Sequence, residues 1–172
     1  INERHTPETP APLPFLPRHP VLPHCLLCQP RVSPSLLYFS QVHPRAPCHA
    51  EQSFLFWFRD QYPCRDEYYN VTWFLSWSPC PTCAEEVVEF LEEYRNLTLS
   101  IFTSRLYYFY NPNYQQGLRK LWDAGVQLDI MSCDEFEYCW DNFVYHKGKR
   151  FQKWNLLKDY GFLAAELQEI LR

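Results

Sequence analysis

Glycine, methionine and long apolar runs are scarce in this 172-residue sequence. Only four glycines and one methionine occur, and no apolar run approaches 18 residues. Without such a run no membrane-spanning helix is expected, and the N-terminus lacks the charged start and apolar segment of a signal peptide. The one methionine is Met131, which predicts that translation starts upstream of Ile1. We therefore expect a soluble, intracellular protein, and we expect Ile1 to be an internal residue of a longer chain.

The sequence also lacks an excess of basic residues. It has 16 Lys and Arg against 20 Asp and Glu, for a net charge of -4, which excludes nucleic-acid binding by bulk charge alone. Hydrophobic residues make up 47% and aromatic residues 18%, enough to bury a core and to exclude disorder throughout. The length fits one domain. Eight cysteines in an intracellular chain favour reduced thiols and a metal site over a disulfide framework.

Proline and glycine are distributed unevenly along the chain. Eleven of the 15 prolines lie in residues 1–48, whereas all four glycines lie after residue 116. Proline removes a backbone donor and fixes φ, so closely spaced prolines prevent a helix or a central strand. We predict a disordered, Pro-rich N-terminal arm over residues 1–40 and one compact domain over residues 41–172. The zinc-like spacing of His24, Cys25 and Cys28 within the arm is attributed to coincidence.

The part of the chain after residue 48 has the pattern of an α/β domain. Apolar segments of strand type, rich in β-branched and aromatic residues, alternate with helical patterns. Helices between successive strands imply parallel pairing of at least the later strands. Strands are expected over 69–75, 97–103 and 126–131, with a strand remnant over 36–41, and helices over 49–59, 81–94, 113–123, 134–143 and 163–171.

Two short motifs together predict a catalytic zinc site. His49 and Glu51 form an H-x-E pattern, and Cys80 and Cys83 form a P-C-x-x-C pattern at a predicted helix start. One imidazole and two thiolates leave a fourth zinc position open to water, and a helix start favours thiolates. Glu51 is too close in sequence to His49 to be a comfortable fellow ligand, so we assign it to proton transfer from water to a leaving amine. The alternative is a structural zinc held by Cys48, Cys64, Cys80 and Cys83, which would leave Glu51 without a role.

A cation and several aromatic residues follow the strand predicted over 97–103. Arg105, Tyr107 and Tyr108 combine a charge with flat rings, which suits the stacking of unpaired bases at on the order of 1–3 kcal/mol each. A second basic cluster suits contacts to phosphates, although such a run is more often a solvated loop. The cluster consists of His146, Lys147, Lys149, Arg150 and Lys153. The side chains expected in the core are Leu106, Phe109, Trp73, Trp140 and Trp154.

The H-x-E and P-C-x-x-C pair is the known signature of zinc-dependent nucleobase deaminases. Further runs, at residues 48–51, 76–80, 101–109 and 138–144, make the resemblance specific. They resemble the AID/APOBEC polynucleotide cytidine deaminases, and within them the third APOBEC subfamily and its second zinc-domain type. The resemblance covers about residues 41–172.

The resemblance implies a three-layer α/β cytidine deaminase fold with a central mixed sheet flanked by about six helices. The family has five strands, and fewer are expected if the Pro-rich segment fails to supply the first hairpin. The implied activity is zinc-dependent deamination of cytosine to uracil in single-stranded DNA, in innate defence against viruses and retroelements. His49, Cys80 and Cys83 correspond to the Zn²⁺ ligands and Glu51 to the proton shuttle.

Further positions correspond to substrate-binding residues of the family. Trp77 and Tyr107 match aromatic walls around a flipped-out cytosine, and the carbonyl of Ser78 matches an acceptor for its amino group. Arg105 matches the arginine that opens the loop reading the base 5′ of the target, and Tyr108 lies where that loop tunes sequence context. The resemblance adds Ala50 to this substrate-binding set.

Partners and location also follow from the resemblance. It implies a single-stranded DNA substrate, RNA as a further partner, oligomers on RNA, a viral antagonist protein and no membrane partner. The expected location is the cytoplasm, with a nuclear pool as the alternative.

Two other functions stay open at this point. One is an inactive or truncated relative that binds zinc and single-stranded nucleic acid, favoured because Ser40 replaces the family's asparagine before Gln41. The other is a deaminase of free nucleosides, disfavoured because that chemistry needs no aromatic loop for flanking bases.

Overall fold

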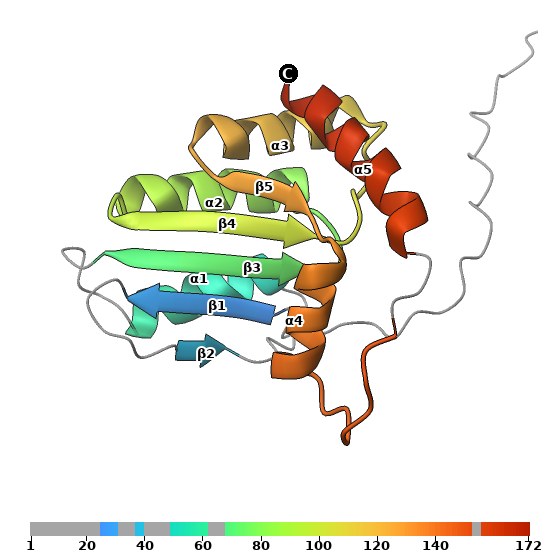
Figure 1. Ribbon diagram of the computed structural model, residues 1–172. Helices are drawn as coiled ribbons and strands as arrows, with labels where there is room; N and C mark the ends of the chain where they lie inside the picture. The colour runs from blue at the N-terminus through green and yellow to red at the C-terminus, as the bar shows by residue number, and fades with distance from the viewer. Residues whose placement is uncertain (1–24, 31–36, 40–48, 62–67, 153–155) are drawn as a thin grey trace, which may run out of the picture.

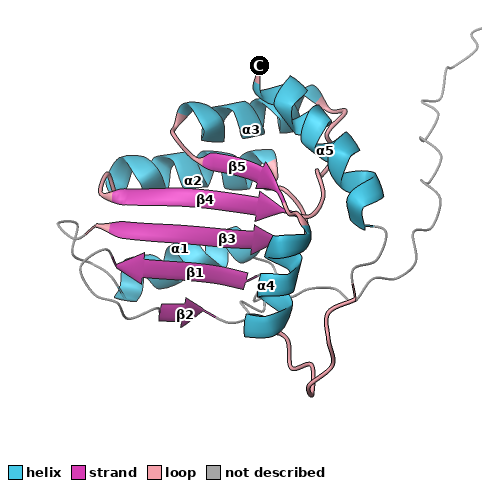
Figure 2. Cartoon of the chain, in the orientation of Figure 1, coloured by secondary structure: helices cyan, strands magenta, loops and turns pink. Residues whose placement is uncertain are grey.

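The computed structural model arranges the chain as helices on both faces of one sheet (Figures 1 and 2). It describes residues 25–30, 37–39, 49–61, 68–152 and 156–172. In chain order the elements are β1 (Cys25–Pro30), β2 (Leu37–Phe39), α1 (Ala50–Gln61), β3 (Tyr69–Leu75), α2 (Pro81–Glu93), β4 (Leu97–Thr103), α3 (Pro112–Asp123), β5 (Gln127–Ile130), α4 (Cys133–Phe143) and α5 (Leu156–Leu171).

The sheet is mixed and has the strand order β2-β1-β3-β4-β5. Strands β3, β4 and β5 pair in parallel, as predicted, while β1 is antiparallel to both β2 and β3. Leu75 pairs with Thr103, so β3 and β4 end at the same level. The loops that follow these two strands therefore meet at one edge of the sheet, where α/β proteins place their sites.

The hairpin β1–β2 lies within residues 1–40, for which the proline content predicts a disordered arm. The short strand β2 falls inside the remnant predicted over 36–41, whereas β1 was not foreseen. Its residues Cys25–Gln29 form a proline-free stretch between Pro23 and Pro30, long enough to pair with β3. Part of the segment thus joins the sheet, and residues 1–24 lie outside the described residues. The boundary at residue 40 stays a prediction.

Two hydrophobic layers hold the helices to the sheet. On the face covered by α1 and α2, Phe54 packs edge-on against Trp73 with ring centroids 5.3 Å apart, and both side chains are fully buried. On the opposite face Phe74 stacks on Phe102, and α4 adds Phe143 to the same cluster. The prediction that Trp73 belongs to the core is confirmed. The described ranges hold no helix with the length and apolar character needed to cross a membrane.

Helix α3 packs closely against the start of α2. A Cβ at Gly117 would lie 3.3 Å from the Cβ of Ala84 and 3.3 Å from the Cα of Pro81. The absence of a side chain at Gly117 therefore lets the two helices approach at the turn that carries the P-C-x-x-C motif. The described residues contain five helices, against about six expected. Helix α5 begins seven residues earlier than predicted, because the helix passes through Gly161, a tolerable cost of about 1 kcal/mol.

Candidate active site

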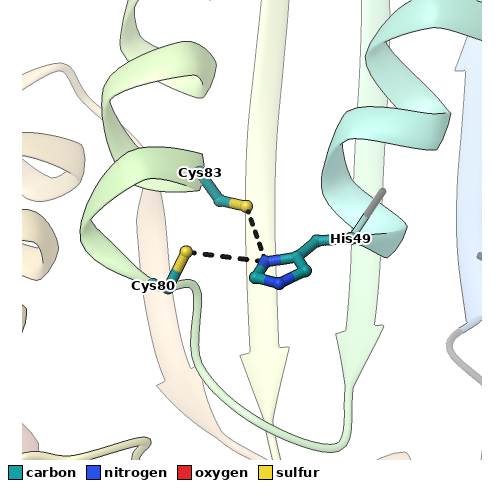
Figure 3. A group of neighbouring side chains, drawn as sticks. All are labelled: His49, Cys80 and Cys83. Atoms are coloured by element: carbon teal, nitrogen blue, oxygen red, sulfur yellow. Dashed lines mark hydrogen bonds between the residues drawn. The ribbon is translucent and has the colours of Figure 1, made fainter. Parts of the chain in front are cut away.

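His49, Cys80 and Cys83 lie together where the starts of two helices face each other (Figure 3). His49 immediately precedes α1, Cys80 is the N-cap residue of α2, and Cys83 lies in its first turn. Nδ1 of His49 is 3.2 Å from Sγ of Cys83 and 3.5 Å from Sγ of Cys80. The structure thus brings together three residues that are 31 and 34 positions apart in the sequence.

The spacing of these three donor atoms fits a tetrahedral zinc ion. With Zn–N near 2.0 Å and Zn–S near 2.3 Å, a tetrahedral site separates nitrogen from sulfur by about 3.5 Å. The three atoms all lie within 4.8 Å of one another. Imidazole nitrogen and thiolate sulfur are donors that zinc favours, and three of them leave one position open. Cys48 and Cys64, which the structural-zinc alternative requires, lie outside the described residues.

The electrostatic environment of His49, Cys80 and Cys83 favours the binding of a cation. Burial raises the pKa of the Cys83 thiol, and the neighbouring Glu51 and Cys80 raise it further. Without a metal, this rise in the pKa of Cys83 outweighs the lowering expected from its position at a helix start, so the thiol form is favoured. A bound dication would reverse the balance, because it stabilises the thiolates and offsets the repulsion among the anionic groups.

Glu51 lies in the first turn of α1 with 8% of its surface exposed. Burial raises the pKa of its carboxyl, and Glu86 adds to the rise, while a backbone hydrogen bond and His49 lower it. Its carboxylate is not among the clustered ligand atoms. A buried carboxyl with a raised pKa beside three metal-ligand atoms suits proton transfer better than ligation.

Two loops lie next to His49, Cys80 and Cys83, which we call the metal group, and hydrogen bonds join these loops to each other. The amide of Ser78 donates to the carbonyl of Arg105 over 2.9 Å, and its hydroxyl accepts from the amide of Tyr107 over 2.8 Å. Earlier in the same two loops, the hydroxyl of Ser104 donates to the carbonyl of Ser76 over 2.7 Å. The loops after β3 and β4 are therefore joined into one unit.

This unit presents the aromatic side chains singled out in the sequence. Trp77 is 44% exposed and contacts Tyr107, with ring centroids 5.8 Å apart. The Arg105 guanidinium lies 5.2 Å from the Trp77 ring centroid, and Tyr107 also contacts Tyr108. Tyr108 is 62% exposed and has a φ of 45°, the left-handed region that non-glycine residues rarely adopt. Ala50 is buried at the start of α1, next to Glu51.

A sequence model described as "APOBEC3, cytosine deaminase domain" matches residues 30–171. The chain belongs to this APOBEC3 family. It is 84% identical over 136 residues to the "DNA dC->dU-editing enzyme APOBEC-3Ca" of Felis catus, which covers 79% of this chain and 71% of that protein. It is 40% identical over 137 residues to the APOBEC-3G of Lagothrix lagotricha and 42% identical over 144 residues to the APOBEC-3 of Mus musculus. In these longer relatives the match spans 36% and 33% of the protein.

One aromatic residue that packs against this loop unit was not foreseen from the sequence. Tyr114, in the first turn of α3, has its ring centroid 5.5 Å from that of Tyr107 and 5.4 Å from that of Tyr108. Desolvation raises the pKa of its hydroxyl, and Tyr107, Cys80 and Tyr108 raise it further. The nearby Gln115 side chain donates to the carbonyl of Phe109. An aromatic residue in the helix turn right after the loop was the available signal.

Proposed function

We propose that this chain deaminates cytosine to uracil in single-stranded DNA, using zinc held by His49, Cys80 and Cys83. The observation that carries the proposal is the buried Glu51 beside three clustered zinc donors, next to an exposed aromatic loop unit. The names of the relatives, DNA dC->dU-editing enzymes, support the same reaction. The zinc assignment is supported by the donor atoms and their spacing.

The reaction needs a nucleophile and a proton carrier. Bound zinc supplies the Lewis acidity that makes water a nucleophile near neutral pH. The attacking water loses two protons: Glu51 carries one to the amino nitrogen on C4, and the other ends on N3 of the base. Water oxygen is added at C4, the C4–N bond breaks, and ammonia leaves, so that cytosine and water give uracil and ammonia. The raised pKa of Glu51 suits this role, because the carboxyl must hold the proton between the two transfers.

The loops after β3 and β4 supply the surfaces for the substrate. A cytosine inside a duplex cannot reach such a site unless it leaves the stack, so single strands are the accessible substrate. Trp77 and Tyr107 provide adjoining rings for the extruded base. Tyr108 and Arg105 provide an exposed ring and a cation for the neighbouring nucleotide.

The test of this function compares three substrates that carry the same cytosine. The purified chain is incubated with a single-stranded oligonucleotide, with its duplex and with free deoxycytidine, and uracil is quantified together with bound zinc. Conversion of the single strand, with far less in the duplex and the nucleoside, is expected. Equal conversion of deoxycytidine would favour a nucleoside deaminase. Bound zinc without conversion of any substrate would favour a non-catalytic relative.

Removing the Tyr114 ring should alter sequence preference more than metal binding. The Tyr114→Leu variant loses both ring contacts that support Tyr107 and the strained Tyr108, so the loop can relax. We expect a several-fold change in the relative conversion of substrates that differ in the base 5′ of the cytosine, with zinc content unchanged. The control is Trp122→Leu, an exposed aromatic residue at the other end of α3. A uniform loss on all substrates, or an equal change in the control, would refute the positioning role.

The wider roles are proposed from the family resemblance. They are innate defence against viruses and retroelements, binding of RNA with assembly on it, recognition by a viral antagonist protein, and location in the cytoplasm with a nuclear pool as the alternative.

A further inference from the structure

The segment that follows α4 forms a structured basic turn, which we define as residues 145–151. The amide of Lys149 donates to the carbonyl of His146 over 2.9 Å, which closes the turn. Lys147 and Gly148 both adopt positive φ, at 50° and 76°. Glycine has this conformation at little cost, whereas lysine is found there less often, so the turn has a defined shape.

A tryptophan of α4 fixes the basic turn to the domain. The Trp140 ring stacks on His146, with centroids 5.7 Å apart and an interplanar angle of 24°. Its Nε1 donates to the carbonyl of Lys149 over 3.0 Å, and its ring also contacts Phe151. Trp140 was expected in the core, but it is only partly buried and serves to hold this turn.

The fixed turn presents cations and one exposed aromatic ring to solvent. Lys147, Lys149 and Arg150 are exposed, and none of them pairs with an acidic group in the described ranges. Tyr145 is 88% exposed, and the ammonium of Lys147 lies 5.8 Å from its ring centroid. This local positive charge occurs in a chain whose net charge is -4. Lys153, also part of the predicted cluster, lies outside the described residues.

The basic turn lies on a different surface from the metal group. It follows α4, which packs on the sheet face of Phe74 and Phe102, whereas His49 and the two cysteines lie at the starts of α1 and α2, which cover the other face (Figure 1). A strand bound at the metal group would therefore have to continue around the edge of the domain to reach the turn.

We propose that the basic turn is a second contact surface for a single-stranded polynucleotide. Lys147, Lys149 and Arg150 bind phosphates, and a base stacks on the exposed ring of Tyr145. Cations next to an open aromatic face are the combination that holds single strands without sequence preference. An acidic protein could pair with the cations, but it would offer no base to stack on the exposed Tyr145 ring. The inference rests on the proposed function for its biological setting, but binding at the turn does not require turnover.

The test measures binding rather than deamination, so its failure is distinct from a failure of the proposed function. Affinities of the zinc-loaded chain for 40-nucleotide single-stranded DNA and RNA are measured by fluorescence anisotropy across a series of salt concentrations. The variant is Lys149→Ala with Arg150→Ala. The control, Arg95→Ala with Arg172→Ala, removes the same charge from exposed positions elsewhere. Melting temperature and zinc content verify that each protein is folded.

The variant should bind on the order of tenfold more weakly near 0.1 M salt. The slope of log K against the logarithm of the salt concentration should be shallower by about 1.4. That slope corresponds to two lost phosphate contacts at about 0.7 each. Tyr145→Ala should weaken binding by about fivefold or more with the slope unchanged, because stacking releases no counterions. A loss of affinity for DNA alone would show that the surface binds the strand that is edited. A loss of affinity for RNA alone would show that it binds a separate ligand. Unchanged affinity, or an equal loss in the control, would overturn the proposal.

Discussion

The Glu51→Gln variant should lose deamination by at least about 10²–10⁴-fold while it keeps its zinc. Glutamine has nearly the same shape as glutamate and fills the same buried space, but its amide cannot accept and return a proton. The proposed zinc ligands His49, Cys80 and Cys83 are untouched by the change. The measurement is the rate of uracil formation in a single-stranded oligonucleotide, with zinc per chain determined on the same sample.

The matched control for this variant is Glu86→Gln. Glu86 is a neighbouring carboxylate on α2 that accepts a hydrogen bond from the Gln52 side chain, and it also raises the pKa of Glu51. A glutamine at position 86 can still accept that bond through its amide oxygen, so most of the activity should remain. Activity retained in Glu51→Gln, or lost to the same extent in Glu86→Gln, would contradict the assigned role.

The Cys83→Ser variant should lose zinc, activity and stability together. Serine is a poor zinc ligand, and the remaining imidazole and thiol form only two-thirds of the donor set. Because bound metal stabilises the folded state, its loss should lower the free energy of unfolding by on the order of 3 kcal/mol. For a chain of this size that corresponds to a Tm lower by roughly 6–12 °C, measurable by thermal denaturation.

Cys139→Ser provides the control for this second variant. Cys139 is as buried as Cys83 but lies in α4, on the opposite face of the sheet and away from the metal group. This variant should lose some stability through the buried hydroxyl, yet it should bind one zinc per chain and remain active. The ligand assignment fails if Cys83→Ser retains a full equivalent of zinc.

The features predicted well from the sequence depend on local residue patterns or on motifs whose residue types suit one kind of chemistry. Strands β3 and β4 were predicted with their observed bounds, because both segments are rich in the β-branched and aromatic residues that favour strands. The meeting of His49 with Cys80 and Cys83 followed from ligand chemistry, since those residue types at that spacing have few other uses. The family assignment followed from the same motifs and is confirmed by the match over residues 30–171.

The features that were missed depend on distant contacts. Strand β1 is recognisable as a strand only through its pairing with β3, 39 to 49 residues later, and its flanking prolines suggest the opposite. Tyr114 resembles any aromatic residue in a helix until its ring is seen against Tyr107 and Tyr108. The direction of the Cys83 pKa shift likewise depends on burial and on Glu51, neither of which a helix-start argument includes.

If His49, Cys80 and Cys83 hold zinc as proposed, their separation along the chain links the folded population to metal supply. His49 and Cys83 are 34 residues apart, and the segment between them contains α1 and β3, the strand that joins the hairpin to the parallel strands. An ion that joins these residues is a removable cross-link, and disulfides that close loops of this span contribute about 3–4 kcal/mol by restricting the unfolded chain. When zinc is scarce, α1 should detach from the sheet more often and expose its apolar face to proteases and chaperones. The lifetime of the protein in a cell would then follow the concentration of free zinc.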